Sequence, residues 1–298
     1  MNHRPTIAML VLAGWTLSGC HPKDKERKSA GKRAHAQDTV LVAASVEPVA
    51  WLGCQLVGPP CRSTALIPPG ASAHSWEPRP SDLQALQGAA IYLRTGLAFE
   101  EAWTPRLQST LPDLRILDLR GGLSLLEERG TRPHRSEEAD PHVWSSPRAF
   151  LQLLDTLAPR WEAAAPQLGP RIRARLPALR SRLIALDTLA RSRLGPYSGR
   201  TFLVNHPGLG YLARDYGLVQ MPLESDGQEL TPVLLFEIRR TAHAQGIRAV
   251  FELPESSRRV ANQVASDLGV PTVDIDLLAR GPYDSIFRAA LEHLAGSL

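Results

Sequence analysis

The sequence contains few of the residues that cross-link or anchor small domains: three cysteines, three methionines and 6% aromatic residues in 298 positions. Three cysteines are too few for a disulfide scaffold. With 43% hydrophobic and 21% charged residues, the composition is that of a globular protein, which excludes a disordered or collagen-like chain. The length indicates two domains or two lobes, each able to bury its own core.

The body of the chain also lacks an excess of charge of either sign. The formal net charge is +4 and the pI is about 9.2. Residues 20–38 hold six of the basic and three of the acidic side chains, and Arg4 adds one positive charge. Residues 39–298 therefore carry 27 basic and 27 acidic side chains, so the basic pI does not indicate a nucleic-acid partner.

An uncharged, largely apolar run occupies residues 6–19. It is too short for a transmembrane helix and typical of the core of a signal peptide, which predicts an exported protein. The run ends in Leu-Ser-Gly-Cys20, which resembles a bacterial lipobox and predicts acylation of Cys20; an ordinary signal peptide is the alternative. Residues 20–38 are then expected to form a polar tether to the membrane.

Once Cys20 is assigned to the lipid, Cys54 and Cys61 remain as an even pair in an oxidising compartment. We predict a disulfide between them, and two buried free thiols are the alternative. A cysteine-based metal site lacks the further thiols that would complete it.

Predicted strands alternate with helical patterns in two successive sets, which is typical of an α/β fold with parallel sheets. The predicted strands are 39–45, 64–67, 89–93, 114–117, 201–205, 218–222, 247–252 and 271–275. We therefore predict two lobes, each with a roughly four-stranded, mainly parallel sheet flanked by helices.

One long helix is predicted to join the two lobes as a spine. Apolar residues recur every three or four positions from Ile172 to Leu194, the period of a buried helical stripe, and Gly195-Pro196 is expected to end the helix. Seven arginines between Arg171 and Arg193 favour a solvated face, with lipid or nucleic-acid contact as the alternative. The expected divisions are a signal peptide (1–19), a tether (20–38), an N-terminal lobe (39–170), a linking helix (171–197) and a C-terminal lobe (198–298).

Four potential metal ligands lie after predicted strands or in turns. His74 follows a strand of the first lobe, whereas His206 and Asp276 follow strands of the second; His142 lies in a turn beyond the first sheet. Ligands bind outside the carboxyl ends of parallel strands, so the four side chains can converge on one site between the lobes. Taken singly, each has a simpler explanation, because loop histidines are usually solvated and an aspartate at a strand end usually caps a helix.

Four segments carry a resemblance to a known family. They are GASAHSWEPRPSDLQALQGAAIYLRTGLAFE, DPHVWSSP, NHPGLGYLARDYGL and DIDLLARGPYDSIFRAALEHL. In this order, with a long helix between the second and third, they resemble the zinc- and manganese-binding solute receptors of bacterial ABC importers, the cluster A-I or ZnuA/TroA-like family. The resemblance covers nearly the whole body from Thr39 onward.

The resemblance implies a two-lobed binding protein with one divalent metal ion in the cleft. The implied ligands are His74, His142, His206 and Asp276. Three imidazoles and one carboxylate favour Zn²⁺ over Mn²⁺, which prefers a more oxygen-rich shell, so manganese is the alternative cargo. Neighbours expected to support the ligands are Glu77, Asp140, Trp144 and Tyr211.

The resemblance further implies delivery of the metal to an ABC permease and its ATPase in the inner membrane. The protein is then expected to be a monomeric receptor in the periplasm or at the cell exterior, with no catalytic role and no nucleic-acid partner.

Two departures from the family pattern limit what is carried over. Many zinc members have a long His-rich, acidic loop before the second histidine, whereas Glu127–Asp140 is short and offers only His134. We therefore expect no auxiliary metal site there. The glutamate that the family commonly shows in a Phe-x-Glu-Pro context is displaced here, so neither Glu252 nor Glu255 is assigned a role.

Two other classes of function compete with the receptor. A secreted zinc hydrolase would need an open coordination position and a general base, such as Glu77 or Asp140 if one ligand were misassigned. The sequence has no HExxH, GxSxG or P-loop motif, and four protein ligands leave no vacancy, which favours capture over catalysis. A surface adhesin or scaffold that had lost metal binding is disfavoured by the intact ligand set.

Overall fold

The computed structural model describes residues 39–298 except 74–75, 122, 124, 127–138, 224–231, 255 and 257. The expected signal peptide, the tether and Cys20 lie outside the described residues, as does His74. Within the described ranges, no helix is both long and apolar enough to cross a membrane.

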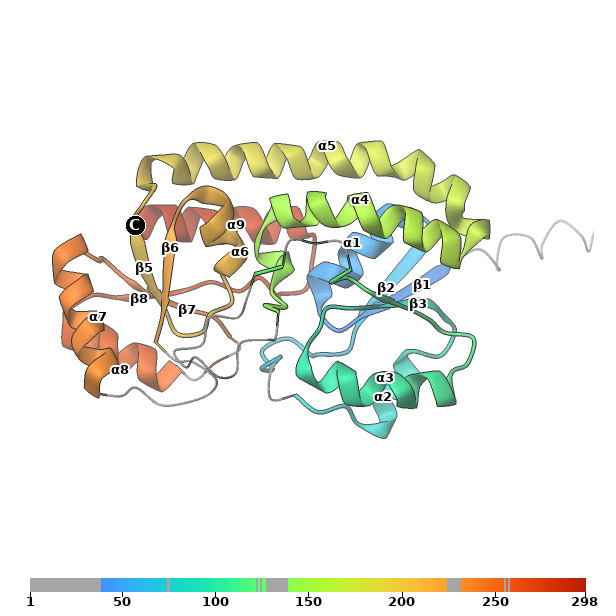
Figure 1. The fold of residues 1–298 in the computed structure, drawn as a ribbon, viewed down its shortest axis with the longest axis horizontal. Helices are drawn as coiled ribbons and strands as arrows, with labels where there is room; N and C mark the ends of the chain where they lie inside the picture. Colours follow the sequence, from blue (N-terminus) through green and yellow to red (C-terminus); the bar gives the residue numbers. More distant parts are fainter. Residues whose placement is uncertain are drawn as a thin grey trace, which may run out of the picture. The chain divides into compact units, whose positions relative to one another are not determined.

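Two parallel four-stranded sheets organise the chain, and they share one topology (Figure 1). The first sheet has the order β2-β1-β3-β4 and consists of β1 (Val40–Ala44), β2 (Cys61–Ala65), β3 (Ala89–Arg94) and β4 (Arg115–Asp118). The second has the order β6-β5-β7-β8 and consists of β5 (Thr201–Val204), β6 (Val219–Pro222), β7 (Val250–Glu252) and β8 (Thr272–Asp274). Neighbouring strands pair in parallel, which confirms the predicted α/β fold of two lobes.

Helices connect and flank the strands. They are α1 (Glu47–Val57), α2 (Pro80–Ala85), α3 (Ala98–Thr110), α4 (Pro147–Ala164), α5 (Gly169–Leu194), α6 (Gly210–Tyr216), α7 (Pro232–Gln245), α8 (Arg258–Leu268) and α9 (Tyr283–Ser297). Short 3₁₀ turns are η1 (Val143–Ser145), η2 (Pro166–Leu168) and η3 (Gly195–Tyr197).

Strand β2 begins three residues before its predicted position at 64–67. It pairs with β1 from Val40 opposite Cys61 to Ala44 opposite Ala65. The polar run Arg62-Ser63-Thr64 is tolerated because β2 is the outer strand of its sheet and its side chains are exposed or half-buried. The prediction was placed too late because it relied on the apolar residues Leu66 and Ile67, which lie beyond the end of the strand.

The long helix predicted between the lobes is α5. Its 26 residues span about 39 Å at ~1.5 Å per residue. The stripe from Ile172 to Leu194 is buried except for Leu176, which is half-buried. Pro177 lies within the helix, and the helix ends just before Gly195. α5 packs against α1 and α4 and against α6 and α9, so one helix supports both halves of the fold (Figure 1).

The arginines of α5 fasten it to its neighbours while their face remains partly solvated. Arg180 pairs with Asp155 of α4. Arg182 bonds both Gln55 of α1 and Asp284 of α9, and its guanidinium lies 5.3 Å from the centroid of a tryptophan ring of α1. Arg182 therefore connects the two lobes.

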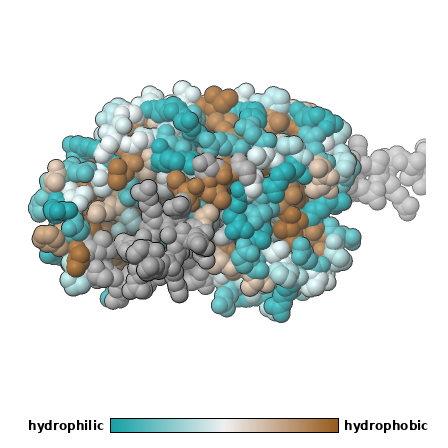
Figure 2. All heavy atoms as spheres, viewed as in Figure 1, coloured by the Kyte–Doolittle hydropathy of each residue, from teal (hydrophilic) through white to brown (hydrophobic). Residues whose placement is uncertain are grey.

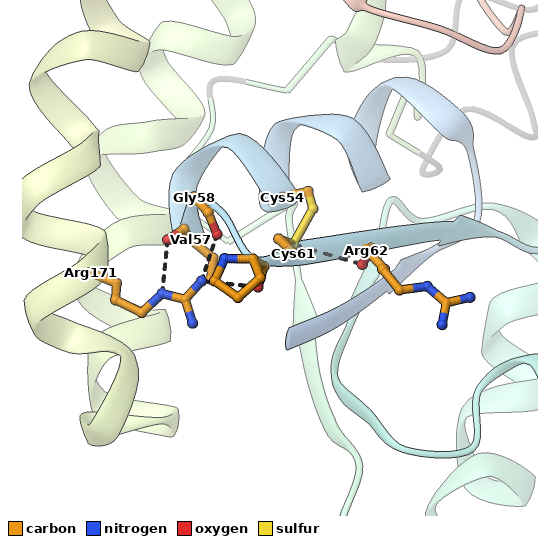
Figure 3. The surroundings of a disulfide bond; sticks show 7 residues. Cys54, Val57, Gly58, Cys61, Arg62 and Arg171 are labelled. Carbon is orange, nitrogen blue, oxygen red and sulfur yellow. Dashed lines mark hydrogen bonds between the residues drawn. A yellow bond between two sulfur atoms is a disulfide. The ribbon is translucent and has the colours of Figure 1, made fainter. Parts of the chain in front are cut away.

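A disulfide joins Cys54 near the end of α1 to Cys61 at the start of β2, the pairing that the sequence predicts; the Cα atoms are 5.7 Å apart. Arg171 of α5 donates to the carbonyl oxygens of Val57, Gly58 and Pro60 in the same turn (Figure 3). The disulfide and the arginine thus hold one turn to the first sheet and to the spine helix.

The largest apolar cluster includes residues of both sheets and of α1, α4, α5 and α9. Smaller clusters cover the other face of each sheet. On the surface shown in Figure 2, hydrophobic residues are scattered among hydrophilic ones. One apolar core therefore packs against both sheets.

Candidate metal centre

Two of the four predicted ligands, His142 and His206, face each other. His142 immediately precedes η1, and His206 lies in the turn after β5. Their Nε2 atoms are 3.3 Å apart and their ring centroids 5.2 Å apart. The side chains are 1% and 7% exposed, so the pair is buried.

The separation of the two Nε2 atoms fits two ligands of one zinc ion. Nitrogens bound at 2.0–2.1 Å to a tetrahedral ion are about 3.3–3.4 Å apart, because the angle between them at the metal is about 109°. The observed 3.3 Å matches this separation.

Asp140 orients the ring of His142. One carboxylate oxygen, Oδ1, accepts the backbone N–H of His142 at 2.8 Å and lies 2.7 Å from its Nδ1. A carboxylate at Nδ1 favours the tautomer with the proton on that nitrogen, which leaves the Nε2 lone pair for a metal. The ring of Trp144 packs edge-to-face with the ring of His142, and the ring centroids are 5.1 Å apart.

The turn that carries His206 is fixed by Asn205, a residue that the sequence did not single out. Its side chain donates to the carbonyl oxygen of Leu253 at 2.9 Å and accepts the N–H of the same residue at 2.7 Å. Asn205 is buried, and it ties the turn after β5 to the turn after the adjacent β7. An asparagine at the end of a strand, directly before a candidate ligand, was the available signal.

Two glycines allow the close packing around the histidines. A Cβ at Gly208 would lie 2.7 Å from Leu253 and 3.4 and 3.5 Å from the rings of His206 and His142. A Cβ at Gly210 would lie 2.7 Å from Oδ2 of Asp140. The motif His-Pro-Gly-Leu-Gly therefore lets α6 approach the turn that carries His142.

Of the other two predicted ligands, only Asp276 lies within the described residues, and it does not form a metal-binding group with this pair. Asp276 is exposed in the turn after β8, and its Oδ1 accepts the N–H of Leu278 at 2.9 Å. His74 lies outside the described residues. Within the described ranges, no group of three or more His, Cys, Asp or Glu side chains is arranged to hold a metal ion. The four-ligand set therefore stays a prediction.

Comparison with known proteins assigns the chain to a family. A family model described as ZnuA, zinc-uptake complex component A, periplasmic, matches residues 42–297. The chain belongs to the ZnuA family. The resemblance seen in the sequence is thereby confirmed.

The similarity to individual ZnuA-family proteins is moderate in sequence and high in fold. A crystal structure of ZnuA has 28% identity and a TM-score of 0.79, covering 87% of this chain and 99% of that one. A ZnuA deletion mutant with bound zinc has 30% identity and a TM-score of 0.78, covering 87% and 98%. The zinc-binding lipoprotein AdcA of Streptococcus pneumoniae is 26% identical over 80% of this chain, which spans 50% of that relative's length.

Glu77 and Glu252, which were also considered for the ZnuA-family site, lie within the described residues. Glu77 is exposed. Glu252 is buried, and its burial raises the pKa of the carboxyl, with Arg258 3.7 Å away. Glu255 and the stretch around His134 lie outside the described residues.

Proposed function

We propose that this protein is the extracytoplasmic receptor of an ABC importer and that it captures Zn²⁺ in the cleft between its lobes. The observation that carries the proposal is the buried pair of imidazole nitrogens, 3.3 Å apart, with a carboxylate on Nδ1 of His142. This pair offers two of the four ligands of a tetrahedral zinc ion. Membership of the ZnuA family supports the same function.

The remaining ligands are His74 and Asp276. With His142 and His206 they supply three imidazoles and one carboxylate, a set that favours zinc over the more oxygen-seeking Mn²⁺. A zinc-bound ZnuA deletion mutant and a streptococcal relative named as a zinc-binding lipoprotein support this choice of cargo. Four protein ligands fill the coordination sphere of zinc, so the protein binds and releases the ion and does not use it for catalysis.

The predicted lipid at Cys20 and the tether of residues 20–38 would hold the receptor at the membrane. There it passes the ion to a permease and its ATPase in the inner membrane, acting as a monomer. The description of the matched family as periplasmic supports the exported location.

Calorimetric titration of the metal-free protein with Zn²⁺ and Mn²⁺ tests this function. We expect one tight Zn²⁺ equivalent, weaker Mn²⁺ binding, and loss of at least 100-fold in zinc affinity in His142→Ala. His243→Ala is the matched control, because His243 is an exposed histidine of α7. Equal affinities of His142→Ala and the wild type would overturn the assignment, whereas tighter Mn²⁺ would keep the receptor and change its cargo.

A further inference from the structure

The hydroxyl of Tyr211 lies at the start of the turn that carries His142. It donates to the carbonyl oxygen of Asp140 at 2.8 Å and accepts the N–H of Leu126 at 3.3 Å, while the N–H of Asp140 donates to the carbonyl oxygen of Leu126 at 2.8 Å. Tyr211 is fully buried. Burial, with the charge of Asp140, raises the pKa of the phenol far above its usual value, so it stays protonated and can donate.

Asp140 links Tyr211 to the candidate ligand His142. Tyr211 bonds the backbone carbonyl of Asp140, and the carboxylate of Asp140 bonds both the backbone N–H and the Nδ1 of His142. Gly210, the neighbour of Tyr211, packs so closely that a Cβ there would meet the second carboxylate oxygen at 2.7 Å. Both the backbone and the side chain of Asp140 are thus set by the start of α6.

Two further side chains from the second half of the chain hold the same turn. Asp215 of α6 accepts the hydroxyl of Ser146 at 2.6 Å, at the end of the turn. Tyr283 of α9 donates to the carbonyl oxygen of Trp144 at 2.8 Å, in its middle. The turn precedes α5 in the sequence, yet these side-chain contacts come from helices that follow α5.

We infer that Tyr211 is a positioning residue that keeps His142 and His206 as a preassembled pair; this inference rests on the proposed function for its effect on metal binding. His206 lies four residues before α6, the helix that bears Tyr211 and Asp215. One helix therefore sets both imidazoles. Metal capture then adds ligands to a pair that is already formed, and release removes those other ligands without separating the pair.

Comparing Tyr211→Phe with Tyr216→Phe distinguishes the positioning of His142 from a general loss of protein stability. Tyr216 is a second buried tyrosine of α6, 5% exposed, whose hydroxyl donates to Asp187 of α5 at 3.2 Å. It also neighbours Ser146, at the opposite end of the turn from Asp140. Both variants remove one buried hydroxyl, but only Tyr211→Phe removes the contact with Asp140.

The first readout is the NMR signal of the Nδ1–H proton of His142, observed in the full-length, metal-free protein. We expect a slowly exchanging signal in the wild type and in Tyr216→Phe, and its loss in Tyr211→Phe. The second readout is zinc affinity, which we expect to fall about tenfold in Tyr211→Phe, as for groups that orient a ligand, and to stay within about twofold in Tyr216→Phe.

An unchanged signal and unchanged affinity in Tyr211→Phe would overturn the positioning role, and so would equal losses in both variants. Failure of the proposed function has a different signature. In that case the wild type binds no zinc, while the NMR signal still decides whether Tyr211 positions His142.

Discussion

Removing the carboxylate of Asp140 should weaken zinc binding without unfolding the protein. In Asp140→Ala, His142 loses the acceptor for its backbone N–H, at 2.8 Å, and for its Nδ1, at 2.7 Å, in a site where its side chain is 1% exposed. Each hydrogen bond to a charged group contributes about 1.5–3 kcal/mol. Without the carboxylate, the tautomer with its proton on Nδ1 is therefore much less favoured over the other tautomer. Loss of such a partner reduces metal affinity about 10- to 100-fold, which corresponds to about 1.4–2.7 kcal/mol.

The assay is competition with a zinc chelator at constant pH and salt, with circular dichroism to show that each variant is folded. Asp140→Asn should fall between the wild type and Asp140→Ala, because an amide oxygen can accept both N–H groups but carries no charge. Asp113→Ala, at an exposed position after α3, is the control. If folded Asp140→Ala binds zinc within twofold of the wild type, the orienting role of Asp140 is refuted.

Three further predictions concern packing, the spine helix and pH. Gly210→Ala should lower zinc affinity severalfold, because its Cβ would lie 2.7 Å from the carboxylate of Asp140, whereas Gly296→Ala, with open space around it, should not; chelator competition decides. Arg171→Ala removes the donor to three carbonyl oxygens and should lower the free energy of unfolding by about 1–3 kcal/mol in urea titrations, with zinc affinity unchanged. Burial raises the pKa of Glu100 above its usual 4.5, so the folded state binds its proton more tightly than the unfolded state. Its contribution to stability is therefore greatest below pH 4.5 and declines as the pH rises through the folded-state pKa; Glu100→Gln should remove this decline, and an unchanged pH profile of denaturant midpoints would contradict it.

The two sheets and the spine helix could be predicted because their signals are local. β-rich runs and the apolar stripe from Ile172 to Leu194 follow from periodicity alone. Strand β2 was misplaced because an edge strand needs little apolar surface, so its polar residues give a weak signal. The role of Arg182 was not predictable, since its partners lie 102 and 127 residues away in α9 and α1.

The site was only partly accessible from the sequence. The sequence predicted that four ligands can converge near the carboxyl ends of the strands, and the structure brings two of them, His142 and His206, together. Tyr211 was expected among the neighbours, but its hydrogen bond to Asp140 spans 71 residues and that of Tyr283 to Trp144 spans 139. Such contacts depend on how the helices pack, which no local pattern encodes. Asp276 accepts a local hydrogen bond from Leu278, as an aspartate after a strand commonly does.

The most direct test of the central claim is a crystal structure of the zinc-loaded protein, with anomalous data collected at the zinc absorption edge. The account predicts one zinc ion bound by Nε2 of both His142 and His206, each at about 2.0–2.1 Å. An anomalous peak away from this pair, with neither Nε2 atom bound to the ion, would contradict it.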